Sequence, residues 1–153
     1  MSSKMHVRID STSVTLHTVD IRDAAAVEGS YSRILLDAPC AGLGVLRRRP
    51  EARWRRQPSD IPTLTGLQRR LLEHAVDICR PGGVVAYVTC SPHLAETEFL
   101  VSDVLKGRPD VVQEPAAGLL PEVPECADGK AIRLWPQRHD TDGMFMALLR
   151  KID

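Results

Sequence analysis

Runs of apolar and alternating residues along the chain predict several strands. Residues 13–20 alternate apolar with polar positions and contain several β-branched side chains, which is typical of a half-buried strand. Residues 34–36 form a short apolar run that ends at Asp37, and residues 84–89 form a longer one. Both runs predict strands that are covered on two faces.

Two segments carry the helical spacing of apolar residues. Residues 63–79 have it, and the Pro-Gly-Gly sequence at 81–83 is expected to stop that helix. Residues 94–105 predict a second helix, bounded by Pro92 and Gly107.

The remaining segments predict loops and two closing strands. Residues 47–62 are basic and dotted with proline, and residues 110–129 have no period, so both are expected to be loops. Residues 131–135 and 144–149 predict strands, joined by a turn over residues 137–143. This order of elements predicts a doubly wound α/β sheet.

Length and composition narrow the class of protein. The chain has 153 residues, which fits one domain, and its 43% hydrophobic and 26% charged residues exclude wholesale disorder. No apolar run reaches the roughly 18 residues of a membrane span, and residues 1–10 have no apolar stretch of a signal peptide. We therefore expect a cytoplasmic protein.

Charge and cysteine content add two observations. The net charge is zero, but six arginines crowd into residues 47–56, which indicates either a solvated surface or a nucleic-acid contact. The four cysteines lie too far apart for a CxxC clasp, so we predict reduced thiols and no metal site.

Polar residues follow the predicted strands at the end where α/β sheets bind ligands. The sequence DAPC occupies 37–40, TCSP occupies 89–92, and Asp20 ends the first predicted strand. Cys40 and Cys90 would then face one pocket, and a thiolate is a strong nucleophile that a following helix N-terminus favours. Taken singly, a cysteine is more often a small buried apolar residue, and a strand-end aspartate is more often a cap or turn former.

Three blocks of sequence occur in an informative order. They are DAPCAGLG at 37–44 with RRRP at 47–50, then LQ at 67–68, PGG at 81–83, YVTCS at 87–91 and Glu96, and finally RLWP at 133–136 with HDTDGMF at 139–145. Together they resemble the Fmu/Sun, or RsmB-like, family of RNA cytosine-5 methyltransferases. The likeness extends over residues 14–151 and is greatest to the bacterial 16S rRNA members.

The resemblance implies a Rossmann-like class I methyltransferase fold and a chemistry for the two thiols. Cys90 would be the nucleophile that adds to carbon 6 of cytosine, and Cys40 would assist release of the covalent RNA adduct. Asp37 would hydrogen-bond the cytosine edge, since a carboxylate suits the exocyclic amine, with Pro39 beside it.

The resemblance also implies ligands. S-adenosylmethionine would be the cofactor, contacted by Asp20 and Asp37. Ribosomal RNA would be the partner, with Arg47 and Arg48 neutralising phosphates and Trp54 stacking on a base or packing. The target base would have to leave its stack.

One part of the family pattern does not occur before Asp37. Residues 1–28 contain no glycine, so the glycine-rich cofactor loop is missing, and residues 1–12 match nothing in the family. We expect a single unit over residues 1–153, the C-terminal part of a catalytic domain, with weak cofactor binding and little or no activity alone. We also expect the edge of the strand ending at Asp37 to be covered, by residues 14–19 or by a second copy in a homodimer.

Two other functions compete with this hypothesis. An RNA-binding or interaction module would keep the basic loop and lack catalysis. A cysteine hydrolase or redox enzyme would need a histidine near a thiol; His93 follows Cys90 by three residues, but no supporting signature accompanies it. His139 and Asp140 are expected to form a turn that lies near the active site in the resembling family.

Overall fold

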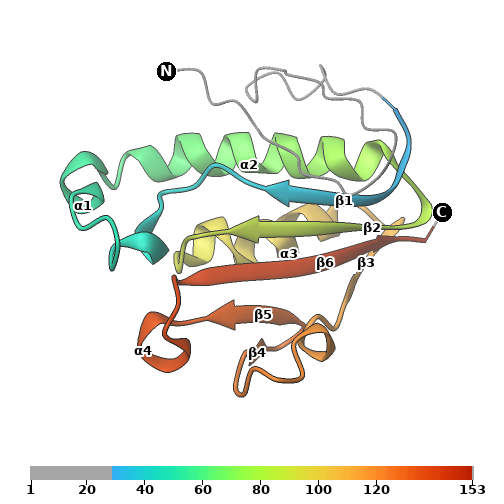
Figure 1. The fold of residues 1–153 in the computed structure, drawn as a ribbon. Coiled ribbons are helices and arrows are strands. Elements are labelled where there is room, and N and C mark those ends of the chain that lie inside the picture. The colour runs from blue at the N-terminus through green and yellow to red at the C-terminus, as the bar shows by residue number, and fades with distance from the viewer. Residues whose placement is uncertain (1–28, 153) are drawn as a thin grey trace, which may run out of the picture.

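A mixed β-sheet organises the computed structural model, which describes residues 29–152 (Figure 1). The six strands of this part of the chain are β1 (Tyr31–Asp37), β2 (Cys79–Thr89), β3 (Val111–Glu114), β4 (Ala127–Asp128), β5 (Ala131–Leu134) and β6 (Met144–Lys151). Their order in the sheet is β1-β2-β6-β5-β4. Strand β3 also pairs with β6, at residues 148–151, whereas β5 pairs with β6 at residues 144–146.

Helices connect the strands. They are α1 (Ala52–Arg55), α2 (Asp60–Asp77), α3 (Glu98–Lys106) and α4 (Pro136–His139), with 3-10 turns η2 (Leu43–Val45), η3 (Leu94–Glu96) and η4 (Ala117–Leu119). No helix among residues 29–152 is long and apolar enough to cross a membrane.

The strand directions bring three chain segments together where strands β1 and β2 end. Strand β1 is parallel to β2, with Asp37 opposite Val88, so the loops after these strands begin side by side. Strand β6 is antiparallel to β2 and sets Phe145 opposite Thr89. The segment just before β6 therefore meets the ends of β1 and β2.

Alternation along β6 shows that the sheet has two different faces. Phe145, Ala147 and Leu149 belong to the main apolar core, to which α2 and α3 both contribute. Met146 and Leu148, which point the other way, pack with a smaller cluster built around the segment after β3. The two long helices thus cover one face, and on the other face Leu35 of β1 is 68% exposed.

The strands and helices predicted around the core are confirmed as elements, but the strand at 34–36 is not covered on two faces, since Leu35 is 68% exposed, and the junction between α2 and β2 was wrong. The Pro-Gly-Gly sequence at 81–83 lies inside β2 and does not stop the helix. Helix α2 ends earlier, where the Ile78 amide bonds to the carbonyls of His74 and Val76. A register shift between β1 and β2 absorbs the extra residues, because Tyr31 pairs with Cys79 but Arg33 pairs with Val84.

The other differences are elements that leave little apolar signal. The predicted helix over residues 94–105 is two pieces, since Thr97 has a non-helical backbone between η3 and α3. The predicted loop over residues 110–129 contains β3 and β4, which are short and pair through backbone groups. The predicted turn over residues 137–143 begins within α4, where Pro136 occupies the first turn.

The first predicted strand, residues 13–20, and the cofactor candidate Asp20 lie outside the described residues. Within residues 29–152, β1 forms an edge of the sheet. The expected covering of this edge stays a prediction.

Candidate functional site

Two thiols meet just beyond the C-terminal ends of strands β1 and β2. Cys40 Sγ lies 3.3 Å from Cys90 Sγ, although the residues are 50 positions apart. Cys40 is buried and Cys90 is half-buried. The pocket that the sequence predicts for these two cysteines is thus formed, and the two thiols are in direct contact.

The contact makes the two thiols chemically unequal. The hydrogen bond from Cys40 lowers the pKa of Cys90 to about 7, against the opposing effects of burial and of the nearby Asp37 charge. The same hydrogen bond, together with burial, raises the pKa of Cys40 well above its ordinary value. At neutral pH, Cys90 is therefore substantially a thiolate and Cys40 remains the protonated donor.

Backbone hydrogen bonds hold together the loop after β1, the loop after β2 and the segment before β6. The Ala38 amide donates to Val88 O (2.9 Å), and the Gly44 amide donates to Cys90 O (2.9 Å). The Gly143 amide, just before β6, donates to Gly44 O (2.8 Å). A Cβ on Gly44 would lie 2.0 Å from Gly143 O, so this approach requires glycine.

A fully buried carboxylate lies beneath the thiols. Glu96 Oε1 accepts from the Ala41 amide (2.8 Å) and from Gln68 Nε2 (3.0 Å), and Oε2 accepts from Ser91 Oγ (2.6 Å). Gln68 Nε2 also donates to Pro39 O (2.8 Å). One side chain thereby joins the segment after Cys40, the segment after Cys90 and helix α2.

The basic loop after η2 is tied to the segment before β6 by ion pairs. Arg47 Nη1 lies 2.6 Å from Asp140 Oδ1, and Arg48 Nε lies 2.9 and 3.0 Å from the carboxylate oxygens of Asp142. The Arg48 hydrogen bond lowers the pKa of Asp142. Further along, Arg56 Nε donates to Ala41 O (3.1 Å), next to the thiols.

Comparison with known proteins gives this arrangement a family. Residues 3–150 match the family model described as 16S rRNA methyltransferase RsmB/F. The chain belongs to the RsmB/F family. The resemblance drawn from the three sequence blocks is thus confirmed.

Individual relatives support the assignment of this chain to the RsmB/F family. The chain is 51% identical over 126 residues to "Putative methyltransferase Rv1407" of Mycobacterium tuberculosis, and the match covers 82% of this chain and 28% of that protein. It is 36% identical over 129 residues to "Ribosomal RNA small subunit methyltransferase F" of Serratia proteamaculans, covering 83% and 27%. The chain therefore spans less than a third of the length of these relatives.

Solved structures support the same α/β fold for this RsmB/F member. The crystal structure of PH0851 superposes with a TM-score of 0.77 and 36% identity, covering 87% of this chain and 30% of that one. The crystal structure of NSun6 from Pyrococcus horikoshii with SFG gives a TM-score of 0.75 and 31% identity, covering 93% and 35%. The fold is thus part of the class I methyltransferase architecture.

The other site residues predicted from the sequence differ in how near they lie to the thiols. Asp37 and Pro39 lie beside the thiols, and Arg47 and Arg48 adjoin them through the segment before β6. Trp54 is 77% exposed on α1 under Arg53, whose guanidinium carbon lies 5.3 Å from the ring centroid, so Trp54 is not part of the core.

His93 and His139, the two histidines considered from the sequence, have structural hydrogen bonds. His93 Nδ1 accepts from the Ala95 amide (3.2 Å), whereas the side chain that contacts the Cys90 thiol is Cys40. His139 Nδ1 accepts from the Trp135 amide (2.8 Å), and its Nε2 lies 3.1 Å from Pro124 O. The thiol–histidine arrangement that a cysteine hydrolase needs is not formed by His93.

The sequence interpretation assigned no role to the buried Glu96 or to Gln68. The sequence did contain a signal for the burial of Glu96: it precedes the buried Leu100 by four positions and so falls on the apolar side of the segment. A carboxylate at such a position must be hydrogen-bonded to be buried.

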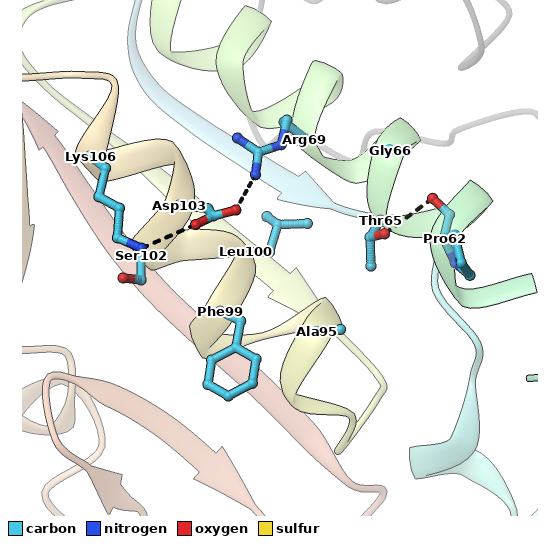
Figure 2. A pocket seen from close by; sticks show the side chains of 10 residues that line it. All are labelled: Pro62, Thr65, Gly66, Arg69, Ala95, Phe99, Leu100, Ser102, Asp103 and Lys106. Carbon is cyan, nitrogen blue, oxygen red and sulfur yellow. Dashed lines mark hydrogen bonds and ion pairs between the residues drawn. The ribbon is translucent and has the colours of Figure 1, made fainter.

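A separate hollow lies between α2 and α3, away from the thiols. Figure 2 shows Arg69 of α2 reaching Asp103 of α3 (2.6 Å), which also pairs with Lys106 (3.2 Å), above the exposed ring of Phe99. None of the site residues predicted from the sequence lines this hollow.

Proposed function

We propose that this chain supplies the thiol side of the active site of a ribosomal RNA cytosine-5 methyltransferase that uses S-adenosylmethionine. The observation that carries the proposal is the 3.3 Å contact between Cys40 and Cys90, with the lower pKa on Cys90. Membership of the RsmB/F family supports ribosomal RNA as the substrate class and the cytoplasm as the place of reaction.

Cys90 acts as the nucleophile. Its thiolate forms an S–C bond to carbon 6 of cytosine, and the electrons of the carbon 5–carbon 6 double bond make carbon 5 enamine-like. Asp37 accepts a hydrogen bond from the exocyclic amine and fixes the ring. Addition is favoured near neutral pH because the Cys90 thiolate is already populated there.

Cys40 assists the release of the product. Once carbon 5 carries its new group, its proton is lost to a base, the S–C bond breaks, and Cys90 departs as a thiolate. The Cys40 thiol donates a hydrogen bond to that thiolate, which stabilises the leaving group. The two cysteines thereby act at opposite ends of one covalent cycle.

The basic loop binds the RNA backbone. Arg47 and Arg48 are exposed although they are paired with Asp140 and Asp142, so phosphates can replace these carboxylates. Exposed Trp54 offers a ring on which an unstacked base can lie.

The described residues do not by themselves complete a cofactor pocket. Asp37 is exposed at the end of β1, β1 is an edge strand within residues 29–152, and no glycine-rich loop adjoins it there. The family, and the SFG present with NSun6 from Pyrococcus horikoshii, support S-adenosylmethionine as the methyl donor. We propose that this chain alone has little or no activity.

A second function, RNA binding without catalysis, is favoured by one observation. The basic loop and Trp54 are fully present, whereas the described residues form only one side of a cofactor pocket. Salt-sensitive RNA binding with no methyl transfer at any cofactor concentration would support this alternative.

The test of the proposed function is covalent trapping on a 16S rRNA transcript over a long incubation with millimolar S-adenosylmethionine, so that even weak cofactor binding and slow turnover would accumulate an adduct. Cys40→Ala should accumulate a protein–RNA adduct that survives denaturing electrophoresis, because release is slowed. Cys90→Ala should form none. An adduct that persists without Cys90 would overturn the assignment, and Cys126→Ala, a buried cysteine outside the site, is the matched control.

A further inference from the structure

The most informative group outside the thiol pair is the buried side chain of Glu96. It has no exposed surface, and its two oxygens accept three hydrogen bonds from side chains and backbone of three different segments. Two of these donors belong to Ala41 and Ser91, each the residue directly after a cysteine of the pair.

We propose that Glu96 is a positioning residue that holds the Cys40 loop against the Cys90 loop and so sets the contact between the thiols. The inference rests on the proposed function for its importance in catalysis. Glu96 itself does not touch the reacting atoms; it acts through the backbone of Ala41 and the hydroxyl of Ser91.

The geometry requires a side chain with two acceptor oxygens. All three partners present N–H or O–H donors to Glu96, and the Ser91 hydroxyl approaches to 2.6 Å. The carboxyl oxygens of Glu96 accept all three bonds, whereas an amide would turn an N–H toward Ser91, whose hydroxyl would have to reverse from donor to acceptor. Removing the carboxylate would leave a buried amide of Ala41 unpaired, which favours movement of that loop.

Helix α2 and strand β2 fix the carboxylate in place. Gln68 of α2 donates to both Glu96 Oε1 and Pro39 O, and the Tyr87 hydroxyl of β2 donates to Glu96 O (2.9 Å). Glu96 is therefore held rigidly between elements that the apolar core already positions, and the two cysteine loops are attached to it.

The experiment measures the pH dependence of Cys90 alkylation by iodoacetamide, with the site located by peptide mass spectrometry. In the unchanged chain the midpoint should lie at about 7. In Glu96→Gln and Glu96→Ala it should move toward the ordinary thiol value of 9.0, because Cys40 no longer donates at close range. Ser91→Ala, the mildest change, should give a smaller shift in the same direction.

The matched control is Val104→Ala. Val104 is a buried core residue of α3, and its truncation weakens the same helical layer without touching either loop. Its midpoint should stay at that of the unchanged chain. If folded Glu96→Gln and Ser91→Ala both titrate like Val104→Ala, Glu96 has a purely structural role and the proposal is overturned.

A second readout reports the distance between the thiols directly. Diamide oxidises the two thiols to a disulfide and is itself reduced to the hydrazine, so the rate of Cys40–Cys90 cross-linking follows their proximity. Glu96→Gln should slow this reaction relative to Val104→Ala; equal rates would overturn the proposal. Neither readout needs RNA or methyl donor, so a failure here is distinct from a failure of the proposed function.

Discussion

Gly44 and Gly143 approach so closely that a Cβ on Gly44 would lie 2.0 Å from the carbonyl oxygen of Gly143. The Gly143 amide returns a hydrogen bond to Gly44 O (2.8 Å), so the contact joins the loop after β1 to the start of β6. Cys90 O, to which Gly44 donates, completes the junction.

We predict that Gly44→Ala destabilises the chain by about 1–3 kcal/mol, because the new methyl group meets backbone that cannot rotate away. Gly66→Ala is the control: a Cβ there meets nothing within 4 Å, and alanine in the interior of α2 should stabilise by about 0.5–1 kcal/mol. Chemical denaturation measures both, and a neutral Gly44→Ala would contradict the description of this junction.

The reactivity of Cys90 should depend on pH through its partner. The Cys40 hydrogen bond is the largest effect that lowers the pKa of Cys90 to about 7, so Cys40→Ala should raise that pKa. Alkylation of Cys90 would then rise through a higher pH range and be slower at pH 7. An unchanged pH profile in Cys40→Ala would show that another group sets the reactivity.

RNA binding should weaken when the basic loop loses one cation. Arg48→Ala is expected to lower affinity for a 16S rRNA fragment and to reduce the slope of log K against log salt by roughly 0.7–0.9. Arg138→Ala, which removes a similarly exposed arginine that pairs with Glu125 outside the loop, is the control. Fluorescence anisotropy across a salt series measures both; equal slopes in the two variants would place the RNA elsewhere.

Binding of S-adenosylmethionine by this chain should be weak. Within residues 29–152, β1 is an edge strand with no glycine-rich loop beside it, and each missing hydrogen bond to a charged group costs about 1.5–3 kcal/mol. Isothermal titration calorimetry should show no saturation at micromolar concentrations. Micromolar binding would mean that residues outside 29–152 complete the pocket.

Strand β1, which lies at one edge of the sheet formed by residues 29–152, should be covered along that edge in solution. Unpaired strand edges pair readily, and the neighbouring Leu35 is 68% exposed on this strand. We expect slow hydrogen exchange along all of β1, owing to residues 14–19 or to a second copy, and sedimentation velocity separates these two cases. A monomer whose β1 amides exchange rapidly would contradict the prediction.

The thiol pair could be predicted from sequence because its geometry follows from topology. Two apolar runs joined by a helix predict parallel neighbouring strands, and residues after such strands meet at one edge. Cys40 and Cys90 therefore had to be close, although the 3.3 Å contact depends on hydrogen bonds that no pattern displays.

Other features could not be predicted because their causes are nonlocal. The bridge through Glu96 depends on Ala41, Gln68 and Ser91 arriving from three segments. Strand β3 exists because β6 offers it an edge, and the Pro-Gly-Gly sequence at 81–83 falls in the register shift of β2, between the β1 pairings of Cys79 and Val84. The turn propensity of that sequence is still visible in the positive φ of Gly82, while the pairings on either side of it keep the segment within β2.

The place of β6 has a consequence for how the molecule matures. It is the last strand along residues 29–152, yet it is inserted between β2 and β5, and the segment before it ties down the loop beside Cys90. During synthesis β1 and β2 emerge long before β6, so a nascent chain whose β6 is still held in the exit tunnel lacks the hydrogen bond from Gly143 to Gly44. The loop beside Cys90 therefore gains its last backbone tie only once β6 has left the ribosome and the sheet is whole.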